Sequence, residues 1–198
     1  MEKYQNKYRV PSARAQWWDY GWNGAYSITI CTKDKKHIFG EIMNSKMYLS
    51  NTGIIADIFW HEIPKHSSFV ELGEFVVMPN HIHGILIFDK PDDGNNVNIV
   101  ETGHALSVQQ SNEHALSVQQ SIGQSRFQNI GSKTISSIIG SYKSAVTRHA
   151  NRLCLEHGWQ SRFYDHIIRN HAEFLKISEY IADNPKNWER DKLYEPYN

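Results

Sequence analysis

The chain has 198 residues, which is enough for one domain with a single buried core. Hydrophobic residues make up 40% of the chain and charged residues 21%, a composition that excludes a disordered or collagen-like protein. Lys and Arg together number 21, as do Asp and Glu, which excludes a wholly electrostatic nucleic-acid binder of the histone type. A local basic surface remains compatible with this balance.

The termini and the cysteines indicate the cellular setting. No apolar run is long enough to span a bilayer, and two charged residues follow the N-terminal Met, which is not typical of a secretory signal. The two cysteines, Cys31 and Cys154, form no CxxC pair, which argues against a disulfide framework and a thiolate zinc site. We therefore expect a soluble protein of a reducing compartment, without a membrane anchor.

The hydrophobic pattern predicts elements in the order strand, helix, strand, strand, helix, strand, helix. Strands are expected at residues 26–32, 72–78, 81–88 and within 159–168, and a short additional hairpin within 39–49. Helices are expected at about 54–63, where Pro64 ends the pattern, at about 132–153, and at 172–183. This order predicts the α+β class, as a ferredoxin-like antiparallel sheet with helices packed on one face.

Residues 90–131 differ from the rest of the predicted single domain, which spans 1–198. Turn-forming residues at 92–96 precede an octapeptide, HALSVQQS, that occurs at 104–111 and again at 114–121. Two copies cannot build a solenoid, which needs at least three stacked repeats. We interpret this segment as a flexible loop insertion without a catalytic role.

The sharpest local motif is the pair His81 and His83. Side chains alternate along a strand, so both imidazoles are expected on the same face, about 7 Å apart along the strand, while Ile82 points the other way. Two imidazoles in this arrangement can converge on one divalent ion. The alternative is a pair of partly buried histidines whose nitrogens are satisfied by backbone partners.

A second motif lies a hundred residues further along the chain. Tyr180 and Asn184 are four residues apart and are therefore neighbours on one face of the predicted last helix, with Tyr180 at the edge of its apolar stripe. A tyrosine with a pKa near 10 is a poor nucleophile unless its target is activated, and a divalent ion on a phosphate provides such activation. The alternative is a tyrosine at the edge of the core. Tyr142, on an apolar stripe, and Tyr164 are weaker candidates.

These segments together resemble a known family. Residues 78–84, MPNHIHG, resemble the HUH motif (His, bulky hydrophobe, His) of single-tyrosine transposases, and most closely that of the REP-associated tyrosine transposases. Residues 159–170 resemble the aromatic and basic segment of that family, residues 180–185 its YIxxNP signature, and residues 26–41 its opening strands. The resemblance covers nearly the whole chain apart from the duplicated segment and the extreme termini.

The resemblance assigns a role to each motif. It implies that His81 and His83 bind a metal ion, Mg²⁺ or Mn²⁺, and that Tyr180 is the nucleophile. Asn184 occupies the place where many relatives supply a third ligand, commonly glutamine. An amide oxygen suits these hard cations, although Asn184 also shapes the helix end before Pro185.

The expected function is that of a metal-dependent, single-stranded DNA endonuclease and strand transferase, forming a 5′-phosphotyrosine intermediate beside a hairpin. Such an enzyme would work in the cytoplasm, at the nucleoid, as a monomer or homodimer, with exposed N-terminal tryptophans stacking on bases. The candidates for contacts to the DNA backbone are Lys143, Arg148, Arg152, Arg162 and Arg169.

Two alternatives from other classes remain open. One is a catalytically retired DNA-binding protein that keeps the fold for regulation. The other is a metallohydrolase that uses the HxH pair to bind zinc and activate water, which requires further ligands; His61, His66 and His166 are too scattered in the sequence to indicate them.

Overall fold

The computed structural model describes residues 21–91 and 133–196, and the structural statements below concern these residues. The central sheet contains β1 (Gly24–Cys31), β4 (Val70–Val77), β5 (His81–Phe88) and β6 (Tyr164–Ile168). Its order is β4-β5-β1-β6, and all neighbouring strands are antiparallel. A separate hairpin joins β2 (Gly40–Met43) to β3 (Lys46–Leu49). The duplicated octapeptide, the expected loop insertion and the N-terminal tryptophans Trp17 and Trp18 lie outside the described residues.

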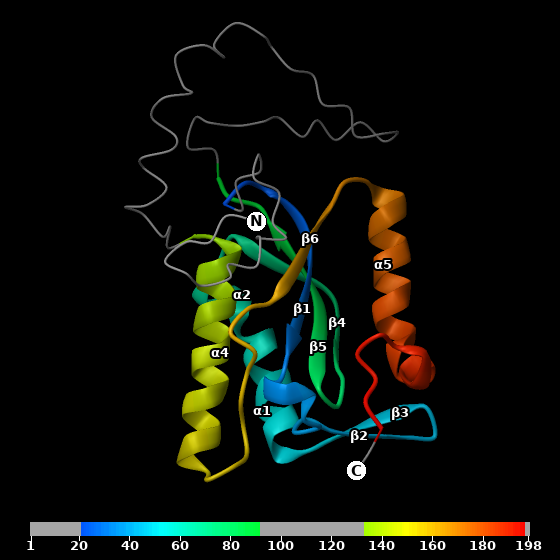
Figure 1. Cartoon of the computed structure of the whole chain (residues 1–198). Coiled ribbons are helices and arrows are strands. Elements are labelled where there is room, and N and C mark those ends of the chain that lie inside the picture. Colours follow the sequence, from blue (N-terminus) through cyan, green and yellow to red (C-terminus); the bar gives the residue numbers. More distant parts are fainter. Residues whose placement is uncertain (1–20, 92–132, 197–198) are drawn as a thin grey trace, which may run out of the picture.

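Helices lie between β3 and β4, between β5 and β6, and after β6 (Figure 1). They are α1 (Asn51–His61), α2 (Ile63–His66), α4 (Ile135–Arg152) and α5 (His171–Asp183), with short 3-10 helices η1 (Lys33–Lys35) and η2 (Asn184–Arg190). The sequence β1-α1-β4-β5-α4-β6, with β1 and β5 at the centre of the sheet, is the ferredoxin-like arrangement. The predicted α+β class with an antiparallel sheet is therefore confirmed.

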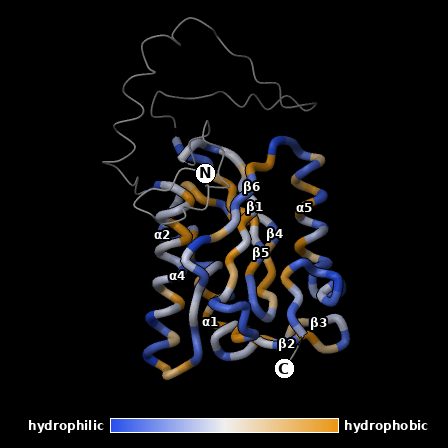
Figure 2. The backbone as a smooth tube through the Cα atoms, in the orientation of Figure 1, coloured by the Kyte–Doolittle hydropathy of each residue, from blue (hydrophilic) through white to orange (hydrophobic). Residues whose placement is uncertain are grey.

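One face of the sheet carries the main hydrophobic core. Alternate residues of the central strands, among them Ile28 on β1 and Leu86 on β5, are fully buried against α1 and α4. Figure 2 shows the hydrophobic residues concentrated along these strands. The Tyr142 hydroxyl, on α4, donates a hydrogen bond of 2.9 Å to the Ala56 carbonyl on α1 and so ties the two helices together. Helices α1 and α4 therefore pack on the same face of the sheet, as the sequence predicted.

Helix α5 packs on the opposite face of the sheet. Its apolar stripe, Phe174, Ile177 and Ile181, forms a second, smaller cluster with Ile85 and Ile87 of β5. The helix follows the last strand of the ferredoxin-like unit, and its stripe meets the face of β5 that α1 and α4 leave uncovered. The side chains of β5 that lie on this second face therefore face α5.

Within the described residues, no helix is both long enough and apolar enough to cross a membrane.

The close approach of Gly84 to Trp60 generates a prediction about stability. A Cβ at Gly84 would lie 2.3 Å from Cζ2 of the buried Trp60 ring. Gly84→Ala is therefore expected to lower the free energy of unfolding by about 1–3 kcal/mol, because the fully buried Trp60 indole has little room to move. Thermal denaturation measures the change.

Gly140→Ala is the matched control. Nothing lies within 4 Å of the position that its Cβ would occupy on α4, so the substitution is expected to raise the free energy of unfolding by up to about 1 kcal/mol. Equal stability of the Gly84→Ala variant and the wild-type protein would contradict the contact with Trp60.

Candidate metal centre

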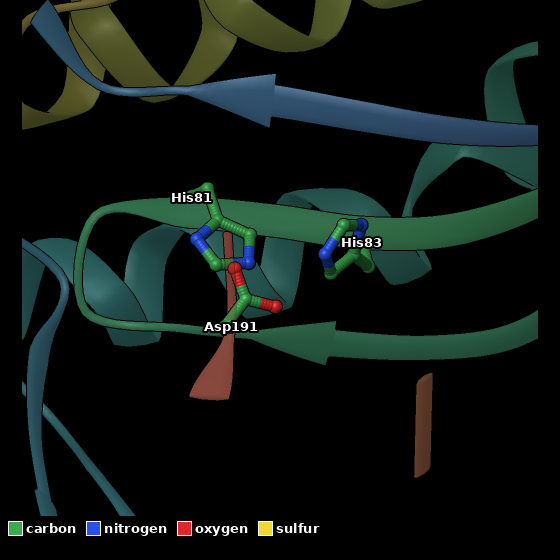
Figure 3. Close-up of side chains that lie close together, drawn as sticks. All are labelled: His81, His83 and Asp191. Atoms are coloured by element: carbon green, nitrogen blue, oxygen red, sulfur yellow. The ribbon is translucent and has the colours of Figure 1, made fainter. Parts of the chain in front are cut away.

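His81 and His83 lie side by side on β5, on the face that α5 covers. Their exposed fractions are 0% and 7%, and their ring centroids are 4.5 Å apart. Both strands that flank β5 pair with it in antiparallel register, so the histidines occupy a central strand. The prediction that the two imidazoles share one face is confirmed (Figure 3).

The hydrogen bonds of the two rings leave one nitrogen of each without a partner. His81 Nδ1 lies 2.8 Å from Asn80 Oδ1, and His83 Nδ1 lies 2.9 Å from Thr29 Oγ1. Asn80 Nδ2 donates to the Leu193 carbonyl, so Asn80 Oδ1 is an acceptor, which puts the proton of His81 on Nδ1. Nε2 of both histidines is buried without a hydrogen-bond partner among the described residues. Buried polar atoms of this kind call for an explanation, and a metal ion supplies one.

Asp191 completes a group of three residues that could hold a metal ion. One ligand atom from each of His81, His83 and Asp191 lies within 4.8 Å of the others (Figure 3). Asp191 Oδ1 accepts a hydrogen bond of 2.6 Å from the Leu193 backbone N–H. Sequence reasoning missed Asp191, because it lies after η2 in a segment without periodicity. Its only sequence signal is a carboxylate a few residues beyond the motif that contains Asn184.

Asn184 lies against Asp191 at the end of α5. Its side chain is 1% exposed, and its Nδ2 donates a hydrogen bond of 2.9 Å to Asp191 Oδ2. Its Oδ1 is buried without a partner among the described residues. Asn184 therefore offers an amide oxygen next to the carboxylate of the three-residue group.

Tyr180 lies at the open side of the same group. Its side chain is 51% exposed, its ring centroid is 5.5 Å from that of His83, and its hydroxyl donates a hydrogen bond of 2.8 Å to Asp191 Oδ2. Burial and the hydrogen bond to the Asp191 carboxylate raise the pKa of Tyr180 to about 12. The hydroxyl is therefore protonated at neutral pH. Asp191 Oδ2 thus accepts hydrogen bonds from both the Tyr180 hydroxyl and Asn184 Nδ2.

The electrostatics of the histidines suit metal binding. Burial lowers the pKa of both imidazoles well below the usual range, and for His81 the neighbouring His83 lowers it further. Both rings are therefore neutral at neutral pH, which is the form that binds metal ions. Two imidazole nitrogens, a carboxylate and an amide oxygen together make a mixed nitrogen and oxygen donor set for a divalent ion. The residues present thus fit such an ion.

The five basic residues expected at a DNA surface come from α4 and from the two ends of β6. Arg148 and Arg152 are exposed on α4, which covers the sheet face opposite the histidines. Arg162 and Arg169 are exposed just before and just after β6. Lys143 is half-buried, and its ammonium donates hydrogen bonds to the carbonyls of Gln160 and Arg162, at 2.7 and 3.5 Å. Lys143 therefore fixes the segment that leads into β6.

Comparison with known proteins identified one sequence relative and a solved structure of similar fold. No family model matches the chain. The chain is 36% identical over 184 residues to an uncharacterized protein of Haemophilus influenzae, with 92% of each chain covered. The structure of the present chain is similar to that of a REP-associated tyrosine transposase bound to a REP hairpin, with a TM-score of 0.52 and 15% sequence identity. The similarity covers 94% of this chain and 89% of the transposase chain. This likeness agrees with the expected α+β fold, an antiparallel sheet with helices packed against it.

The donor set predicts stabilisation by a divalent ion. At a Mn²⁺ concentration 100 times the dissociation constant, the free energy of unfolding of the wild-type protein is expected to rise by about 2.7 kcal/mol, because the ion binds only the folded chain. His83→Ala and Asp191→Ala should each lose most of this gain. Thermal denaturation with Mn²⁺ and with EDTA measures it.

His61→Ala is the matched control for this prediction. His61 is exposed at the end of α1, a helix of the opposite sheet face, so this variant should keep the full Mn²⁺ effect. A full Mn²⁺ effect in Asp191→Ala would contradict a ligand role for Asp191.

Proposed function

The chain belongs to the family of the Haemophilus influenzae protein, and we propose that it is a metal-dependent endonuclease and strand transferase that acts on single-stranded DNA through Tyr180. One observation carries the proposal: the Tyr180 hydroxyl hydrogen-bonds to Asp191, the carboxylate that lies against the unpartnered His81 and His83 nitrogens. A candidate nucleophile and a candidate metal centre thus share one side chain. The transposase fold is compatible with this chemistry.

His81, His83 and Asp191 would hold the ion, with the Asn184 amide oxygen as a further donor. We propose Mg²⁺ or Mn²⁺, which accept such oxygen-containing sets. When bound, the ion would polarise the scissile phosphate and neutralise its charge. In His81, donation from Nδ1–H to Asn80 Oδ1 leaves the Nε2 lone pair free for the ion, and in His83 the bond between Nδ1 and Thr29 Oγ1 would do the same when Nδ1 carries the proton.

Tyr180 would attack the phosphorus atom of the scissile phosphodiester. The Tyr180 oxygen loses its proton and forms a bond to phosphorus, while the bond from phosphorus to the 3′ oxygen breaks. The 3′ oxygen takes up a proton and leaves as a 3′ hydroxyl, so the step consumes and releases no net proton. The 5′ phosphate stays on the tyrosine, and the phosphodiester energy is kept for rejoining by a 3′ hydroxyl. Asp191 orients the Tyr180 hydroxyl before attack through its hydrogen bond of 2.8 Å.

The proposed substrate is a single strand or the single-stranded flank of a hairpin. The transposase of the same fold was solved with a REP hairpin. In this chain the exposed Arg162 and Arg169 flank β6, which belongs to the same sheet as the histidines. Arg162, two residues before Tyr164, is the proposed contact to the DNA backbone at the end of β6 whose register row contains His83. Arg169 would contact DNA that extends past the other end of β6, and Arg148 and Arg152 would contact DNA that reaches α4. The enzyme would work in the cytoplasm as a monomer or homodimer.

Asp191 also favours a second candidate function, a metallohydrolase. Two histidines and one carboxylate are a ligand set with which metalloenzymes activate a bound water. In that case water would be the attacking group, and no covalent bond to the protein would form.

Replacing the Tyr180 hydroxyl tests the proposal. Wild-type protein incubated with labelled single-stranded genomic fragments and Mn²⁺ should yield a protein–DNA adduct that survives a denaturing gel. Tyr180→Phe should bind Mn²⁺ and DNA but form no detectable adduct, because only the attacking oxygen is removed. Tyr164→Phe, the matched control, should form the adduct at the wild-type level.

An adduct in Tyr180→Phe would exclude Tyr180 as the nucleophile. Mn²⁺-dependent nicking by the wild-type protein without any adduct would instead identify the metallohydrolase.

A further inference from the structure

Tyr164 is an exposed aromatic residue whose position the candidate metal centre does not explain. Among the described aromatic residues it is the most exposed, at 59%. It is the first residue of β6, an edge strand of the central sheet. Its ring is therefore available to a ligand that approaches this edge of the sheet.

The register places Tyr164 in the same cross-strand row as His83. Thr29 on β1 pairs with Tyr164 on one side and with His83 on the other, so the three side chains lie on one face of the sheet. The hydrogen bond between Thr29 Oγ1 and His83 Nδ1 agrees with this placement. Tyr164 therefore lies on the face of the candidate metal centre, separated from His83 by the single strand β1.

The spacing along this row suits a nucleic-acid strand. Neighbouring strands are about 4.8 Å apart, so the backbones at Tyr164 and His83 are separated by about 10 Å. Stacked nucleotides rise by about 3.4 Å per step along one strand, so the separation corresponds to about three steps. A phosphate held at His83 and Tyr180 would thus place a base only a few nucleotides away at the Tyr164 ring.

An open groove lies beside the segment that leads into β6. It has a volume of about 520 Å³ and is lined by Trp159, Gln160, Ser161, Arg162, Lys33 and Asp34. The Gln160 N–H donates to the Cys31 carbonyl, which places the lining segment beside the end of β1 whose register position is opposite His81. Two cations and one carboxylate line it, a charge balance that favours an anionic ligand such as a phosphate backbone.

We propose that Tyr164 is a base-stacking residue that positions the DNA strand next to the scissile phosphate, with Arg162 and Lys33 holding the adjoining phosphates. The inference rests on the proposed function and names the surface that carries the substrate. Base stacking on an aromatic ring tolerates any sequence, because every base has a π face. Tyr164 would act as a positioning residue, since it would touch a flanking base and leave the attack to Tyr180.

The test compares three variants by fluorescence anisotropy with a fluorescein-labelled mixed-sequence single strand in EDTA, where no cleavage occurs. Tyr164→Ala is expected to raise the dissociation constant roughly tenfold, because a stacked base is lost. Tyr164→Phe keeps the ring and should stay within about twofold of the wild-type protein. Ile58→Ala should leave binding unchanged, because Ile58 is 51% exposed on α1, across the sheet from Tyr164.

A second readout separates stacking from a merely structural role. A strand that carries 2-aminopurine should lose fluorescence on saturation with the wild-type protein or Tyr164→Phe, and lose much less with Tyr164→Ala. Wild-type affinity and wild-type quenching in Tyr164→Ala, together with adduct formation by the wild-type protein, would overturn the stacking role alone. A wild-type protein that neither binds single strands nor forms an adduct would overturn this inference and the proposed function together.

Discussion

The antiparallel pairing of β5 with β1 is the constraint on which the candidate site depends. The register runs without a break from Gly24 opposite Phe88 to Cys31 opposite His81. Gly84 in this register faces the Trp60 ring on the core side, so His81 and His83 must face the side of α5. A slip of one residue would turn both imidazoles into the main core, where Trp60 leaves no room for a side chain. The packing of Trp60 against Gly84 on the core face of β5 thus determines that His81 and His83 lie on the face that α5 covers.

This arrangement has a cost that a ligand would relieve. Leaving a polar atom buried without a partner costs about 1–3 kcal/mol, and the site contains three such atoms, on His81, His83 and Asn184. The C-terminal segment brings Asp191 to the site, held by the bond from Asn80 to the Leu193 carbonyl and by the Lys35–Glu195 ion pair. Residues before β4 and just before β5 therefore help to place one carboxylate near the C-terminal end of the chain.

The sequence predicted the parts of the site that depend on local geometry. The shared face of His81 and His83 follows from the two-residue period of a strand, and the contact of Tyr180 and Asn184 with one carboxylate follows from the four-residue spacing of a helix. Asp191 could not be found in this way, because tertiary contacts place an irregular segment.

The basic residues illustrate the same limit. Lys143 was expected to contact DNA, but tertiary contacts turn its ammonium to the Gln160 and Arg162 carbonyls. A crystal soaked in Mn²⁺ and measured at the manganese absorption edge tests the central claim most directly, because it locates the ion without reference to activity. The account predicts one anomalous peak within coordination distance of His81 Nε2, His83 Nε2 and the Asp191 carboxylate. A fully loaded crystal with its peak elsewhere, or with no peak at these atoms, would contradict it.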